Sequence, residues 1–176
     1  MHNKELTRTK YMKKLCFMIL FLLSFISVSS AQEKENENQP LPRMVSFRSD
    51  YINARSGPGT RYPIEWIYKQ KHAPVEIVSE FELWRKIKDW EGSETWVHKA
   101  MLQNQRYIKI TKQGLSNVYA KPQLDSKVIA KVENEVIGHV EKCPEQKDFC
   151  LIKFSTIEGW VSRGDIYGVY PNEIID

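Results

Sequence analysis

The 176-residue chain has little of what marks several protein classes. It contains 3 cysteines, 8 glycines and 8 prolines, too few for a disulfide-rich scaffold or a collagen-like repeat. Its longest apolar run, residues 15–26, is shorter than the roughly 20 residues that a membrane-spanning helix needs. These scarcities exclude knotted, fibrous and multispan membrane classes. They leave a chain long enough for one ordinary domain or two small ones.

An excess of one charge is also missing from most of the chain. The formal net charge is +4, but five of the 26 basic residues and one of the 22 acidic residues lie in residues 1–31. The rest therefore carries 21 of each sign. A body without net charge has no overall field to attract a polyanion, so we expect no nucleic-acid partner.

The amino-terminal residues have the three parts of a secretory signal. Residues 1–14 are polar and basic, residues 15–26 are apolar, and Ser29, Ser30 and Ala31 supply small side chains. This order predicts a signal peptide over residues 1–31 with cleavage near Ala31, an uncleaved anchor being the alternative. We expect a periplasmic or secreted protein whose mature chain has no transmembrane helix.

The remaining chain is predicted to be a flexible linker followed by an all-β body. Residues 32–44 are mostly charged or amide side chains, which offer little to bury. After them come short runs rich in β-branched and aromatic residues, separated by turn formers such as Arg55–Thr60. Strands are predicted over 64–68, 74–78, 84–87, 95–97, 136–142 and 151–154. Alternation suggests an interior made by Ile52, Ala54, Val75, Ile77, Trp84, Ile87 and Val97.

An internal repeat is visible at an offset of 64 residues. Asn53 matches Asn117, Pro58 matches Pro122, and the pair Trp96-Val97 matches Trp160-Val161. Two copies of one small fold explain this spacing better than a solenoid, which needs at least three repeats. We therefore place two domains at 45–104 and 113–172, the second a degenerate copy, meeting at about 102–113. Copies this small are marginal alone and are expected to pack together.

The first copy resembles the bacterial SH3-like domain family. The resemblance rests on the segments 51–60 (Tyr-Ile-Asn-Ala-Arg-Ser-Gly-Pro-Gly-Thr), 74–78, 84–87 and 95–98, with Thr95 where the pattern usually has glycine. Residues 116–122, 158–162 and 167–170 resemble a second copy without the Gly-Pro-Gly turn. The pair is similar to exported tandem SH3-like proteins of alphaproteobacteria. The resemblance implies two tandem small SH3-like barrels, five-stranded and strongly bent.

Two cysteines remain in the mature chain, Cys143 and Cys150. An even count in an oxidising compartment favours a disulfide between them. Two thiols are too few for a zinc site, and a thioredoxin-type pair has a two-residue gap. We predict a bond across the second copy's hairpin that stabilises it.

Signs of catalysis are weak. The histidines are scattered, no serine lies in a nucleophile elbow, and the cysteines are expected to be paired. Five carboxylates near Trp84 and Trp90 could serve a glycosidase, but lysines and an arginine alternate with them, as on a solvated strand face. We expect no enzyme, metal or cofactor. The carboxylates are Glu80, Glu82, Asp89, Glu91 and Glu94.

A binding role remains. Aromatic rings stack on sugar faces or extended peptides, while loop charges fix orientation. Trp90, between charged residues, is expected to be an exposed ring at a hairpin tip, whereas Trp84, Trp96 and Trp160 are expected in the core. We predict a peptidoglycan- or peptide-binding envelope protein, with an adaptor for another envelope protein as the alternative. The predicted ligand-binding residues are Tyr51, Arg55, Arg61, Tyr62, Trp66 and Trp90.

Overall fold

The structure is a computed structural model that describes residues 39–145 and 147–176. The predicted signal peptide and linker residues 32–38 lie outside the described residues. The first strand begins at Arg43, so the last two residues assigned to the linker belong to the folded body. In the described part of the chain no helix is both long and apolar enough to span a bilayer.

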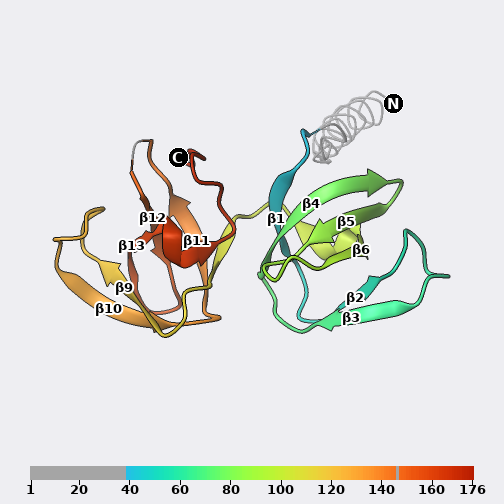
Figure 1. Cartoon of the computed structure of the whole chain (residues 1–176), viewed down its shortest axis with the longest axis horizontal. Coiled ribbons are helices and arrows are strands. Elements are labelled where there is room, and N and C mark those ends of the chain that lie inside the picture. Colours follow the sequence, from blue (N-terminus) through green and yellow to red (C-terminus); the bar gives the residue numbers. More distant parts are fainter. Residues whose placement is uncertain (1–38, 146) are drawn as a thin grey trace, which may run out of the picture. The chain divides into compact units, whose positions relative to one another are not determined.

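The described chain is all-β, as predicted, with two seven-stranded antiparallel sheets (Figure 1). The first sheet has the order β3-β2-β6-β5-β4-β1-β7, which extends the five strands that the family resemblance implied. Most of its strands meet in hairpins, and a 3-10 helix at Lys99–Met101 precedes β7. The strands are β1 (Arg43–Phe47), β2 (Ile52–Arg55), β3 (Ile64–Tyr68), β4 (Pro74–Phe81), β5 (Trp84–Lys88), β6 (Glu94–His98) and β7 (Leu102–Gln103).

The second sheet repeats this topology with the order β10-β9-β13-β12-β11-β8-β14. Several elements recur at the 64-residue offset seen in the sequence. Strand β13 begins 64 residues after β6, and the 3-10 helix Arg163–Asp165 begins 64 residues after the helix Lys99–Met101. The second sheet begins at Tyr107, inside the segment 102–113 where the sequence placed the junction. Its strands are β8 (Tyr107–Ile110), β9 (Leu115–Tyr119), β10 (Val128–Glu133), β11 (Ile137–Lys142), β12 (Phe149–Lys153), β13 (Glu158–Ser162) and β14 (Ile166–Tyr167).

Each sheet encloses its own core. Six of the seven predicted interior residues of the first copy are buried in one cluster, because alternate residues of a strand face the same side. Trp84 is the exception and is only half-buried. It lies three residues before Ile87, so the pleat that turns Ile87 inward turns Trp84 outward. The prediction of a core role for Trp84 is therefore wrong, and Trp96 and Trp160 are likewise half-buried beside inward-facing Val97 and Val161.

The predicted disulfide is present between Cys143 and Cys150, whose Cα atoms are 4.3 Å apart. Both cysteines are fully buried in the second core. The bond ties the end of β11 to β12 across the loop 144–148. It therefore crosses the hairpin for which the sequence predicted it.

The two sheets contact each other through a buried lysine. Lys109, on β8, is 1% exposed, and its Nζ lies 3.4 Å from the ring centroid of Trp90 in the first copy. The same ammonium pairs with Glu135 at 2.5 Å and donates to the Gln70 side chain at 3.2 Å. A cation this buried needs such partners, because desolvation without them is costly. The contact bears out the expectation that the copies pack together.

Candidate functional site

The conformation of the Gly-Pro-Gly loop is held by three of the predicted ligand-binding residues, Arg55, Arg61 and Tyr62. The guanidinium of Arg55 donates to the backbone oxygens of Thr60 at 3.1 Å and Tyr62 at 2.7 Å. The Tyr62 ring packs on Gly57, where a Cβ would lie 2.5 Å from it. Arg61 lies over the same ring, 5.2 Å from its centroid. Arg55 therefore closes the loop, while Arg61 remains exposed and able to meet a ligand.

Tyr51 and Trp66 are both exposed, at 54% and 55%. Trp66 stands opposite Ala54 in the β2–β3 hairpin, whereas Tyr51 directly precedes β2. Trp66 lies on the same side of the sheet as Ala54 and Ile52. Tyr51 is the neighbour of Ile52 in the chain, so its side chain points to the opposite side. The structure thus leaves both rings available to solvent without joining them in one groove.

Trp90 is not the exposed ring that the sequence suggested. It is half-buried, packs on the first core and meets the Tyr68 ring edge-on at 6.0 Å. Its other neighbour is the Lys109 ammonium, on a strand 19 positions further along the chain. Sequence reasoning placed Trp90 at a turn correctly, but it had no means of seeing that the second copy covers this turn.

Asp89 organises the same turn. Its Oδ1 accepts backbone N–H groups from Glu91 at 3.0 Å and Ser93 at 2.9 Å, and its Oδ2 accepts the Tyr68 hydroxyl at 2.8 Å. Burial, and then the hydrogen bond to Asp89, raise the pKa of Tyr68 far above its usual value. Tyr68 therefore stays protonated and acts as a fixed donor. Both groups serve the turn rather than a reaction.

A surface that the sequence analysis missed lies on the outer side of the first sheet. Trp84 stands between Phe81 on β4 and His98 on β6 in the ladder, and the rings of Trp84 and His98 meet edge-on at 5.5 Å. Trp96 lies two residues from His98 and opposite Arg55. We call Phe81, Trp84, Trp96 and His98 the aromatic face. Strict alternation from Ile87 and Val97 would have identified its two tryptophans.

Charges frame the aromatic face. Lys86, which lies opposite Trp96 and two residues from Trp84, pairs with Glu94 at 2.5 Å. The hydrogen bond from Lys86 lowers the pKa of Glu94. Phe81 is 51% exposed and neighbouring Leu83 is 50% exposed. Half-buried rings beside fixed charges can stack on sugar rings or hold an extended peptide.

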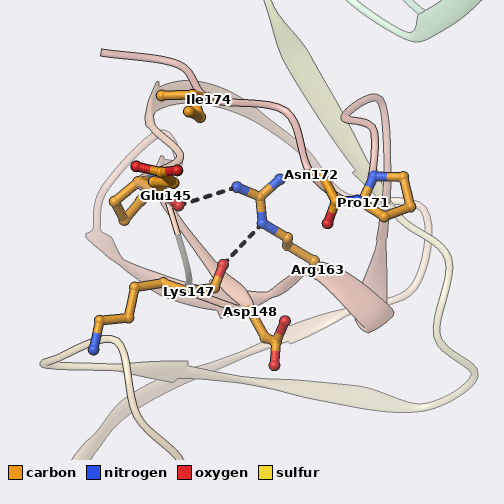
Figure 2. A pocket seen from close by; sticks show the side chains of 8 residues that line it. Glu145, Lys147, Asp148, Arg163, Pro171, Asn172 and Ile174 are labelled. Atoms are coloured by element: carbon orange, nitrogen blue, oxygen red, sulfur yellow. Dashed lines mark hydrogen bonds between the residues drawn. The ribbon is translucent and has the colours of Figure 1, made fainter.

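A hollow lies in the second copy, with a volume of about 370 Å³ (Figure 2). Arg163 is its central cation and donates to the backbone oxygens of Lys147 at 3.1 Å, Tyr170 at 2.9 Å and Glu173 at 2.8 Å. These bonds tie the carboxyl-terminal segment to the disulfide loop. Because the guanidinium already donates hydrogen bonds to these backbone oxygens, we assign Arg163 a structural role. Within residues 39–145 and 147–176, no group of three metal-binding side chains is present.

Comparisons with known proteins give one family match, which covers the first copy, and two structural similarities. A family model described as the bacterial SH3 domain matches residues 48–104. Two solved structures are similar: NlpC2 from Trichomonas vaginalis, at 12% identity and a TM-score of 0.33, and NlpC1 from the same organism, at 11% and 0.33. Each covers 74% of this chain, which spans 49% and 46% of theirs, about half their length. No curated protein matches the chain.

The family match and the structure agree on the first copy. The matched residues run from the residue after β1 through the residue after β7 and include the Gly-Pro-Gly loop and the aromatic face. The second sheet has the same strand order. Residues 48–104 of this all-β chain therefore form a domain that belongs to the bacterial SH3 family.

Proposed function

We propose that the protein is a non-catalytic, exported binding protein of the bacterial cell envelope that recognises peptidoglycan or its peptides. The observation that carries the proposal is the aromatic face on the outer side of a bacterial SH3 domain. Its half-buried tryptophans offer stacking surface to a sugar or an extended peptide. Export is inferred from the sequence of residues 1–31, and the Cys143–Cys150 disulfide fits an oxidising compartment.

The histidines of the described residues support a role without catalysis. Nδ1 of His98 accepts the backbone N–H of Ala100 at 3.2 Å. His72 contacts the Gln103 amide at 2.9 Å, and His139 contacts Glu141 at 3.1 Å. Each is held by a structural partner, whereas a general base is expected beside a nucleophile.

An envelope adaptor is the second candidate. It is favoured by exposed apolar side chains in both copies, among them Trp66 at 55% and Leu124 at 74%. An adaptor would need a protein partner, whereas wall recognition needs only the polymer. The two functions therefore separate in a purified system.

The test is co-sedimentation of the protein with protein-free peptidoglycan. We expect the wild type to sediment with the polymer, and Trp96→Ala or Trp84→Ala to weaken binding about tenfold through lost stacking. Trp160→Ala, the equivalent change in the second copy, is the matched control and should bind normally. Trp66→Ala tests the ring predicted from the sequence.

Folding of each variant is checked by near-UV circular dichroism. Failure of the wild type to sediment would rule out wall recognition and favour crosslinking in the envelope to find a protein partner. Equal loss in Trp160→Ala and Trp96→Ala would move the site away from the aromatic face.

A further inference from the structure

The two copies place different chemistry at one equivalent position. Lys86 stands opposite Trp96 in the first copy, and Leu151 stands opposite Trp160 in the second. Arg85, which precedes Lys86, and Cys150, which precedes Leu151, therefore occupy equivalent positions in the two sheets. Arg85 pairs with Glu80 at 3.1 Å, just as Cys150 is bonded to Cys143. Glu80 in β4 thus corresponds to Cys143, the residue that follows β11.

In the second copy, the chain's own carboxyl-terminal segment occupies the edge at this position. Cys143 donates its backbone N–H to Ile175 at 2.7 Å and accepts the Ile175 N–H at 3.0 Å, as in an antiparallel ladder. The Ile175 side chain packs on the second core. Figure 1 shows this segment in red beside β11. It is an extended peptide bound to a sheet edge, supplied by the chain itself.

The corresponding edge in the first copy is open within the described residues. β1 pairs with β4 only from Ser46 to Arg43, which lies opposite Ile77. The chain bends at Leu41 and Pro42, and a proline could not donate a ladder bond. Glu80 lies in β4 between Ser79 and Phe81. A two-residue loop joins β4 to β5, and alternate residues of β4 form backbone hydrogen bonds with β5. The backbone N–H and C=O of Glu80 therefore point away from β5, toward this open edge.

The side chains at this edge favour a carboxylate. Arg43 and Arg85 both pair with the single carboxylate of Glu80. The Nε and Nη1 atoms of Arg43 are buried and have no hydrogen-bond partner among the described residues. Two guanidinium groups therefore share one carboxylate, and the surplus positive charge attracts an acidic group to this edge. Phe81 and Leu83, each about half exposed, lie at the end of the same hairpin and offer apolar contact.

We propose that the β4 edge at Ser79–Phe81 binds an extended segment of a partner protein by strand addition, with an aliphatic residue next to an acidic one. The carboxyl-terminal sequence Glu173–Asp176 of this chain, two acids around two isoleucines, illustrates that pattern on the equivalent edge. Strand addition draws affinity from backbone hydrogen bonds and specificity from flanking side chains. This site uses the backbone edge of β4 and shares only Phe81 with the aromatic face, so it does not require wall recognition.

The test uses the full, oxidised, isotope-labelled chain and a synthetic acetylated peptide with the sequence of residues 170–176. Amide chemical shifts and hydrogen exchange are measured by NMR during titration. We expect the Glu80 amide to shift and its exchange to slow at least about tenfold at saturation, as it gains a ladder bond. The same peptide N-methylated at the residue corresponding to Ile175 lacks the donor and should not bind.

Two protein variants test the role of the cation. Arg43→Met removes one of the two positive charges at this edge and should weaken peptide binding about tenfold. Arg48→Met makes the same change at an exposed position just after β1 and should have no effect. The N-methylated peptide requires no protein variant, so the test remains decisive even if Arg43→Met fails to fold.

Three outcomes would overturn the proposal. The Glu80 amide could remain unchanged at millimolar peptide, the N-methylated peptide could bind as well as the parent, or the shifts could be confined to Cys143 and its neighbours. The last result would mean that the peptide only replaces the chain's own carboxyl-terminal segment. Failure of wall sedimentation would leave this proposal unaffected.

Discussion

Gly57 shows how a single residue shapes the loop beside the aromatic face. The Tyr62 ring lies against the Gly57 backbone so closely that a Cβ there would be 2.5 to 2.6 Å from three ring atoms. At Gly59 the nearest approach of the same ring is 3.4 Å. The two glycines flank Pro58, yet only the first is required by packing.

Gly57→Ala should therefore displace Tyr62 and destabilise the protein by about 1–3 kcal/mol, the range for overpacking. Gly59→Ala is the control and should change stability by less than about 0.5 kcal/mol, because the added methyl makes an ordinary contact. Urea unfolding followed by tryptophan fluorescence measures both. Equal effects would show that Tyr62 moves away from Gly57 without cost.

Individual residues differ in how well their burial could be predicted from the sequence. Alternation identified Ile87 and Val97 as interior, and both are fully buried. The prediction for Trp84 was wrong because it departed from this alternation: Trp84 lies an odd number of residues from Ile87 and therefore faces the other side of the sheet. Trp90 could not be placed from local sequence, since its burial depends on Lys109, a residue of the other copy. Cross-copy contacts leave no periodic signal in a chain.

Among the elements, the β4–β5 and β11–β12 hairpins carry different links in the two copies. One has the Arg43–Glu80–Arg85 ion cluster, and the other has the disulfide and a bound carboxyl-terminal segment. The strands themselves could be predicted from composition: residues 64–68 form β3 as expected. The carboxyl-terminal pairing could not, because residues 170–176 have no strand-like pattern and bind through Arg163 and Arg106.

Replacing both Cys143 and Cys150 with serine should destabilise the second copy by about 2 kcal/mol or more. The bond restricts the unfolded chain by closing a short loop, and both positions are fully buried, so serine hydroxyls add a desolvation cost. Hydrogen exchange read by NMR should show faster exchange at Cys143 and Ile175 positions before β4 is affected. Uniform acceleration across both sheets would contradict this localisation.

At the scale of the whole molecule, the described body depends on polar contacts between its two sheets. Besides Lys109, the Tyr167 hydroxyl donates to the Lys88 backbone oxygen at 3.1 Å, and the Tyr170 hydroxyl donates to Glu76 at 2.8 Å. The His72 ring stacks on Tyr107 at 4.3 Å, with Gln103 at its Nδ1. The hydrogen bonds of this contact need each group to be a donor or an acceptor, so the stability of the contact depends on the protonation state of its titratable side chains.

His72 should make this body less stable as the pH falls. Burial first, then the charges of Lys71 and His139, lower the pKa of His72, although Asp50 opposes them. The unfolded chain, with an ordinary histidine pKa near 6.5, therefore binds more protons than the folded chain just below that pH. Stability from neutral His72 is present above about pH 6.5 and is lost as the pH falls toward the lower folded pKa.

Urea midpoints between pH 7.5 and 5.5 test this expectation. His72→Gln, which cannot be protonated, should flatten the decline, whereas His98→Gln, at the cap of the 3-10 helix in the first sheet, should preserve it. Glu173 makes a separate contribution below about pH 4.5. Its burial raises the pKa, but hydrogen bonds from Arg106 and the Tyr170 backbone outweigh burial and lower it. A decline that survives in His72→Gln would assign the acid sensitivity to groups outside the contact between the sheets.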